Sequence, residues 1–238
     1  LTAAELDQVV EATFRHTAVC LFDLYHNLHD REAAERMIEF TPEIDTVIQS
    51  SQEGRQRLVV VGVHMSNFDM VAQAAALRGL RAQAISVERP NKGYQWQNKL
   101  REMSGLEITP ASKSALRRAT QRLENNGVVL TGLERPLPGS RYHPLFFGQP
   151  APLPVAHIQL ALKTQSPVVV AAAVMRADGV YSIQASNPIE LRSYPDRNTE
   201  ILTNAERILE IAEDFIRQAP YQWSMFFPVW PDLRSEVP

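Results

Sequence analysis

Apolar and polar positions follow two different patterns along the chain, and the change comes near residue 58. Residues 3–50 carry apolar side chains at helical spacing, as in Val9, Phe14 and Leu21, and hold no run typical of a strand. After residue 58, short and almost wholly apolar runs alternate with stretches of helical spacing. The expected strands are 58–63, 82–87, 106–109, 128–133 and 167–175, and the expected helices are 67–78, 92–104, 112–126, 154–165 and 199–218.

Strands that are apolar throughout and separated by helices are typical of a parallel sheet covered on both faces. One antiparallel pair is also expected, because a turn at 177–179 leads into the alternating residues 181–186. The predicted fold is therefore α/β, with a mostly parallel central sheet flanked by helices and a helical N-terminal segment. We expect a single domain, 1–238, with residues 1–50 as the helical segment and residues 55–232 as the α/β core.

The composition narrows the classes of protein that fit. The 238 residues are 45% hydrophobic and 21% charged, a balance typical of one folded domain. A single cysteine, Cys20, rules out an internal disulfide and a cysteine-based metal cluster. No apolar run approaches the roughly 18 residues of a membrane span. The chain begins at Leu1 rather than at a methionine, so the sequence leaves open whether a signal or an anchor precedes it.

The net charge of -3 conceals an uneven distribution of charge. Residues 1–53 contain 11 acids against 3 Lys or Arg, whereas residues 78–122 contain 10 Lys or Arg against 3 acids. A basic segment in an acidic chain favours an anionic ligand or headgroup surface over nucleic acid, because nucleic-acid-binding domains usually carry a basic total. The alternative, that these charges only form solvated helix faces, stays open.

The expected strand 58–63 ends in a histidine, and an acid follows within the next helical turn. His64 comes directly after LVVVGV, and Asp69 falls in the first turn of the expected helix. The spacing alone carries little weight, because about 0.7 such pairs arise by chance from this composition. At a strand end, however, a carboxylate can fix the tautomer of an imidazole and raise its basicity. A catalytic couple and a structural pair both fit these two residues.

A second expected strand, 128–133, ends in Glu134 and Arg135. Parallel sheets bind ligands outside the carboxyl ends of their strands. We therefore expect Glu134 to orient His64 or a hydroxyl group, and Arg135 to contact a phosphate or a developing oxyanion. The sequence contains no Gly-rich phosphate loop, no Gly-x-Ser-x-Gly elbow and no metal-spaced histidine cluster, which argues against kinases, most serine hydrolases and zinc enzymes.

Aromatic residues gather in the loop RYHPLFFGQPAPLP and in the tail YQWSMFFPVW. Phe146, Phe147 and Phe226 are candidates for lining an apolar cavity, although aromatic residues in such numbers also commonly close a core. His157, on an apolar helix, fits a structural histidine, and His16 lies far in sequence from the strand end.

The block VGVHMSNFD resembles the His-X-X-X-X-Asp/Glu motif of the lysophospholipid acyltransferase superfamily. The segments after it are similar, in the same order, to the lipid A lauroyl and myristoyl acyltransferase branch, which includes phosphatidylinositol mannoside acyltransferase. These segments are VERPNKGYQWQNKLREMSGLEI, GVVLTGLERP, HPLFFGQPAPLP, SPVVVAAAVM and QWSMFFPVWP. The resemblance covers roughly residues 10–232 and is more specific than the His64 and Asp69 pair alone. It implies a glycerol-3-phosphate acyltransferase-like fold.

The activity that this resemblance implies is transfer of a fatty acyl chain from acyl-CoA or acyl carrier protein to a hydroxyl of a membrane lipid or glycolipid. His64 is then the general base, Asp69 orients and polarises it, and Glu134 supplies the second acid. Pro136 stands where relatives often carry another acid, so any role of that acid has no counterpart here.

The resemblance also implies where substrates bind and where the protein acts. The candidates for substrate or phosphate binding are Asn67, Arg101 and Arg135, and those for the acyl pocket are Phe146, Phe147 and Phe226. No cofactor, metal or nucleic acid is implied, since the partners are an acyl thioester donor and a lipid acceptor. The N-terminal helices are expected to contact the cytoplasmic face of the plasma (inner) membrane peripherally.

Two other functions fit the same residues. A thioesterase or lipid hydrolase would use His64 with water as the acceptor, and a lipid-binding protein would have no reaction to catalyse. Loss of thioester turnover in His64→Ala would exclude the binding protein.

Overall fold

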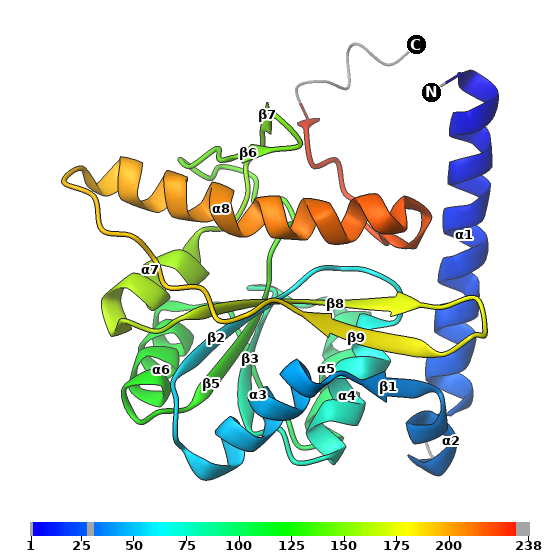
Figure 1. Cartoon of the computed structure of the whole chain (residues 1–238), viewed down its shortest axis with the longest axis horizontal. Coiled ribbons are helices and arrows are strands. Elements are labelled where there is room, and N and C mark those ends of the chain that lie inside the picture. The colour runs from blue at the N-terminus through cyan, green and yellow to red at the C-terminus, as the bar shows by residue number, and fades with distance from the viewer. Residues whose placement is uncertain (1, 28–30, 232–238) are drawn as a thin grey trace.

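The computed structural model describes residues 2–27 and 31–231. Within them the main sheet has seven strands in the order β1-β9-β8-β2-β5-β3-β4 (Figure 1). These strands are β1 (Ile38–Phe40), β2 (Leu58–Gly62), β3 (Ala82–Ser86), β4 (Glu107–Pro110), β5 (Val128–Gly132), β8 (Val168–Met175) and β9 (Tyr181–Ala185). Neighbouring strands are parallel except β8 and β9, which form an antiparallel hairpin. The predicted mostly parallel α/β fold is confirmed.

Helices cover both faces of the sheet (Figure 1). On one face α6 (Lys113–Glu124), α7 (Ala156–Thr164) and α8 (Arg197–Gln218) pack with Val59 and Val61 of β2. On the other face α3 (Pro42–Glu53), α4 (Phe68–Leu77) and part of α1 (Ala3–His26) pack with Leu58 and Val60, and α5 (Lys92–Met103) lies beside α4 and β4. Successive side chains of a strand point to opposite faces, and both faces of β2 are buried under helices. This explains why β2 is apolar throughout.

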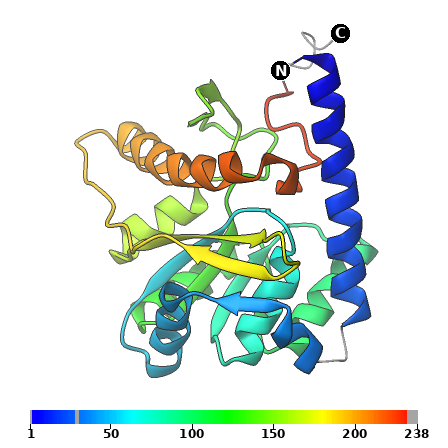
Figure 2. The ribbon, with the colours of Figure 1, turned by 45° about the vertical axis from the view of Figure 1, so that its right-hand side comes forward.

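Helix α1 (Ala3–His26) runs along one side of the molecule, beside the end where β8 turns into β9 (Figures 1 and 2). It begins with a capping box, in which Thr2 and Glu5 each bond to the backbone of the other. Along its 24 residues only His16, Cys20 and Leu24 are buried. This stripe at a spacing of four residues is narrow, so most of the helix surface faces outward.

The remaining elements lie outside these layers or at their edges. They are α2 (Arg31–Arg36), the small hairpin of β6 (Leu145–Phe146) and β7 (Gln149–Pro150), and the 3₁₀ turn η1 (Pro220–Gln222). The prediction that residues 3–50 hold no strand is wrong, because β1 pairs in parallel with β9 at the edge of the main sheet. Its three residues are too few to show a period of two, so the sequence pattern gave no signal.

Candidate active site

The carboxyl ends of β2 and β5 meet in register in the middle of the sheet. Gly62 at the end of β2 pairs with Gly132 at the end of β5. Each strand is followed two residues later by a titratable side chain, His64 after β2 and Glu134 after β5. The register therefore brings a histidine and an acid together at the edge where parallel sheets bind ligands.

Two hydrogen bonds join His64 to Glu134. The His64 backbone N–H donates to Glu134 Oε1 at 2.6 Å, and His64 Nδ1 lies 3.2 Å from Glu134 Oε2. Because an ionised carboxylate only accepts, Nδ1 carries the proton in this contact. The Glu134 side chain is 0% exposed, whereas that of His64 is 22% exposed. Within the described residues Nε2 has no hydrogen-bond partner, so it is the nitrogen left to accept a proton from a ligand.

Burial and charge oppose each other in this pair. Burial acts to lower the pKa of His64, but the Glu134 carboxylate, with a smaller contribution from Asp69, raises the pKa above its ordinary value. Burial likewise acts to raise the pKa of Glu134, but the His64 charge and N–H groups, together with Trp223, lower it. Glu134 therefore stays ionised and supports a basic imidazole.

Gly132 provides the space in which the His64 ring lies. A Cβ at this position would sit 2.8 Å from His64 Cε1, a distance that real Cβ atoms essentially never show, and 3.4 Å from Nε2. Phe68 packs edge-on against the ring, with the ring centroids 5.0 Å apart. Gly132 was not among the predicted site residues, although a glycine inside an apolar strand is a known signal of close approach.

Trp223 contacts the buried acid, which the sequence did not predict for this residue. Its indole Nε1 donates to Glu134 Oε1 at 3.1 Å. The two residues are separated by 89 positions, and nothing in the aromatic tail indicates which tryptophan reaches the sheet edge.

Asp69 lies close to the pair but does not bond to the His64 ring. It accepts instead from Arg101 Nε at 2.6 Å, and Arg101 Nη1 donates to Asn98 at 3.0 Å. We expected Asp69 to fix the His64 tautomer, but in the structure Glu134 makes that contact. Asp69 acts on His64 only through its charge. Arg101, expected to bind phosphate, has its Nε engaged by this carboxylate.

Arg135 lies on the same edge, held by two aromatic rings. Its guanidinium stacks 4.1 Å from the ring centroid of Phe227 and 5.1 Å from that of Tyr94, and Nη1 donates to the Tyr94 hydroxyl at 2.8 Å. Its charge acts on His64 and opposes protonation of that ring. The expectation of an open apolar cavity beside Arg135 stays a prediction.

Asn67, expected to contact substrate, is 3% exposed and makes internal bonds. Its amide Nδ2 donates to the Cys20 carbonyl at 2.9 Å, and its Oδ1 accepts from the Met70 N–H at 3.4 Å. These are the contacts of a helix N-cap that joins α4 to α1, and they leave the expected phosphate-binding role without support.

The three phenylalanines proposed for the acyl pocket lie in two different places. Phe146 is 0% exposed and packs with Phe147, Trp223 and Trp230, so it closes a core rather than lining an open cavity. Phe147 is partly buried at the edge of the same cluster. Phe226 is 53% exposed and contacts Phe14 of α1 at a centroid distance of 5.6 Å.

Of the other histidines, His16 lies closer to the site than its sequence position suggested. It is buried, and its Nε2 lies 3.0 Å from Ser66 Oγ in the loop between His64 and Asp69. His157 is buried on α7, where burial lowers its pKa to about 4, as expected of a structural histidine.

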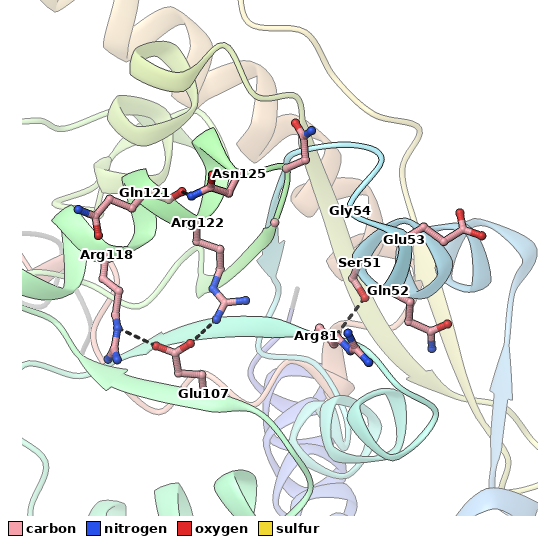
Figure 3. Close-up of a pocket in the computed structure, with 12 residues that line it drawn as sticks. Ser51, Gln52, Glu53, Gly54, Arg81, Glu107, Arg118, Gln121, Arg122 and Asn125 are labelled. Atoms are coloured by element: carbon pink, nitrogen blue, oxygen red, sulfur yellow. Dashed lines mark hydrogen bonds and ion pairs between the residues drawn. The ribbon is translucent and has the colours of Figure 1, made fainter.

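A polar surface pocket opens at the amino ends of the strands, on the edge opposite to His64. Glu107 at the start of β4 lies within it, between Arg118 and Arg122 of α6 (Figure 3). Arg101, from the same basic segment 78–122, pairs with Asp69 at the other edge. The basic segment is therefore divided between the two edges, and part of its charge is neutralised by ion pairs.

The model of the bacterial lipid A biosynthesis acyltransferase family matches residues 1–231. Comparison with curated protein sequences returned no match. Across the residues that the structure describes, none of the helices combines the length and the hydropathy needed to cross a bilayer. Because the family model matches nearly the whole chain, the protein belongs to the bacterial lipid A biosynthesis acyltransferase family and is an acyltransferase.

Proposed function

We propose that the protein transfers a fatty acyl chain from an acyl thioester, acyl-CoA or acyl carrier protein, to a hydroxyl of a membrane lipid or glycolipid, with His64 as the general base. One observation carries the proposal. The buried Glu134 engages His64 Nδ1, whereas Nε2 of the partly exposed ring has no partner among the described residues. A histidine oriented in this way is suited to take a proton from a bound hydroxyl.

The reaction then follows from the roles of these groups. His64 Nε2 takes the hydroxyl proton while the acceptor oxygen attacks the thioester carbonyl, and Glu134 stabilises the imidazolium that forms. Collapse of the tetrahedral intermediate breaks the carbon–sulfur bond, and the thiol leaves with the proton from His64. The products are an ester and a free thiol, so no cofactor is consumed.

Arg135 is placed to help with negative charge. An arginine carries five N–H donors, and Arg135 gives one of them to Tyr94. The others suit a phosphate of the acceptor or donor, or the oxyanion of the intermediate. Phe227 and Tyr94 hold the guanidinium plane and restrict its rotamers.

His64→Ala tests the proposal, with His143→Ala as the matched control because His143 is exposed. Thiol release from acyl-CoA and ester formation, read by mass spectrometry of the lipid, are measured together. We expect His64→Ala to lose transfer by at least about 100-fold while the chain still folds, as judged by circular dichroism, and the control to keep transfer. Near-normal transfer in His64→Ala would overturn the mechanism. Thiol release without ester would indicate a hydrolase.

We propose further that α1 is the part that contacts the membrane, at the cytoplasmic face of the plasma membrane where soluble thioester donors occur. The helix exposes a set of large apolar side chains, namely Leu6, Val10, Phe14, Val19, Leu21, Phe22 and Tyr25. Phe226 and Trp96 extend this surface, through ring contacts with Phe14 and Tyr25 respectively. An amphipathic helix that exposes such a face binds at a lipid interface.

Vesicle binding tests this contact. Phe14 and Phe22 are 62% and 64% exposed, so the double variant Phe14→Glu and Phe22→Glu should leave the fold intact. We expect it to lose at least about tenfold in co-sedimentation with phosphatidylcholine and phosphatidylglycerol vesicles, because two apolar side chains become charged. Leu137→Glu, at a 50% exposed position outside α1, is the control. Equal binding by all three proteins would refute the contact.

A further inference from the structure

The C-terminal residues Gln222 to Ser224 lie along the loop that carries His64. We call residues 63–67 the catalytic loop. The Ser66 N–H donates to the Gln222 carbonyl at 2.7 Å, and the Ser224 N–H donates to the His64 carbonyl at 2.9 Å. Between these bonds Met65 and Trp223 form an antiparallel bridge. The catalytic loop is therefore paired with a segment nearly 160 positions away in sequence.

Gln222 anchors this segment to the sheet. Its side chain is 1% exposed; its Oε1 accepts from the Met175 N–H at 2.8 Å and its Nε2 donates to the Met175 carbonyl at 2.8 Å. Met175 ends β8, which is the strand next to β2. The segment is thus fixed to the same rigid sheet that positions His64.

The Trp223 side chain completes the hydrogen bonding of the buried acid. Glu134 Oε2 faces the His64 ring, and Oε1 accepts from both the His64 backbone and the Trp223 indole. Without the indole, Oε1 would keep only the His64 backbone donor, in a site where Glu134 is 0% exposed to water.

We infer, on the basis of the proposed general-base function, that Trp223 is a positioning residue. Its indole N–H holds the Glu134 carboxylate in place, and the carboxylate in turn orients the His64 ring. The indole also shares the negative charge of the carboxylate. A donor that binds a carboxylate makes it a weaker acceptor for its other partners. Trp223 therefore affects both the direction and the strength of the contact that Glu134 makes with Nδ1.

Trp230 offers a control within the same aromatic cluster. Both tryptophans contact Phe146 and Phe147, and their rings lie 6.4 Å apart. The indole Nε1 of Trp230 is buried and has no hydrogen-bond partner in the described part of the chain. Replacing either tryptophan by phenylalanine removes a similar volume, but only Trp223→Phe removes a donor from Glu134.

The experiment compares Trp223→Phe and Trp230→Phe in the full chain. We expect Trp223→Phe to lower kcat about tenfold with KM within about twofold, because the defect is in the acid–base pair rather than in binding. We also expect the NMR titration of the His64 ring to move to higher pH, since Glu134 becomes a stronger acceptor. Trp230→Phe should leave both unchanged. Adding Trp223→Phe to Glu134→Gln should cause little further loss, because the indole then has no charge to hold.

Each alternative result overturns the inference. Equal effects of the two variants, or a loss in Trp223→Phe without a titration shift, would mean that Trp223 only packs. If Trp223→Phe does not fold, 3-benzothienylalanine at position 223 keeps the shape and removes the N–H, and the same shift is required. Failure of the proposed function is distinguishable, because His64→Ala would then keep transfer whereas the His64 titration would still move in Trp223→Phe.

Discussion

The two edges of the central sheet each hold a glutamate with basic partners, but they hold it in different environments. At the carboxyl edge Glu134 is 0% exposed and bonds to a histidine ring, a backbone N–H and an indole. At the amino edge the Glu107 side chain is 32% exposed, between Arg118 and Arg122, whose side chains are 62% and 28% exposed. The first acid is enclosed by donors of fixed geometry, and the second by flexible side chains in contact with water.

The difference shows why a count of ion pairs does not locate an active site. Exposed pairs typically contribute about 0–1 kcal/mol, since solvent screens them and the side chains lose entropy. Breaking a buried pair commonly costs about 3–5 kcal/mol, because one charge is left without a partner. A fully buried acid therefore demands a complete set of donors, and that same set fixes the tautomer and basicity of His64.

Replacing the buried acid should have the largest effect. Glu134→Gln keeps the shape but removes the charge, so we expect kcat to fall at least about 100-fold and the His64 titration to move to lower pH. Steady-state kinetics and NMR of the histidine ring measure the two effects. An unchanged titration would show that Glu134 does not set the basicity of His64.

The same variant also tests how the His64–Glu134 pair makes the unfolding free energy depend on pH. The raised His64 pKa gives stability that is fully present below the ordinary value of 6.5 and is lost as pH rises through the folded pKa. The lowered Glu134 pKa gives stability that is present above its ordinary 4.5 and is lost as pH falls through the folded pKa. The difference in unfolding free energy between the native protein and Glu134→Gln should therefore be largest between pH 4.5 and 6.5, by urea denaturation.

Gly132→Ala should have an intermediate effect, because its new Cβ would meet the His64 ring at 2.8 Å. The ring must turn or shift, so we expect kcat to fall about tenfold or more while the melting temperature changes little. Gly62→Ala is the matched control, since Gly62 pairs with Gly132 and its Cβ would meet nothing within 4 Å. Equal activity of the two variants would refute the close approach.

The sequence predicted the sheet and the edge of the site, because both depend on local pattern. Wholly apolar runs between helices specify parallel strands, and the residues that end those strands must meet at one edge. This reasoning placed His64, Glu134 and Arg135 correctly at the carboxyl edge. The roles of these residues in catalysis stay predictions.

The partners within the site depend on contacts that no local pattern encodes. Asp69 is near His64 in sequence, but the start of α4 directs it to Arg101, whereas the register of β2 with β5 brings Glu134 to the ring. Trp223 reaches Glu134 only because the tail pairs with the catalytic loop. Such long-range pairing is a property of the folded chain and cannot be read from spacing.

Glu107→Gln should have the smallest effect and so sharpens the contrast with Glu134→Gln. The pocket around Glu107 (Figure 3) lies at the opposite edge from His64, and the Glu107 side chain is partly exposed. We expect acyl transfer within about twofold of the native protein and a loss of unfolding free energy below about 1 kcal/mol. The loss should shrink further in 1 M salt, where exposed charges are screened within about 3 Å. A large loss of transfer in Glu107→Gln would show that the two edges of the sheet are coupled. The difference in burial between Glu134 and Glu107 would then no longer explain which edge is catalytic.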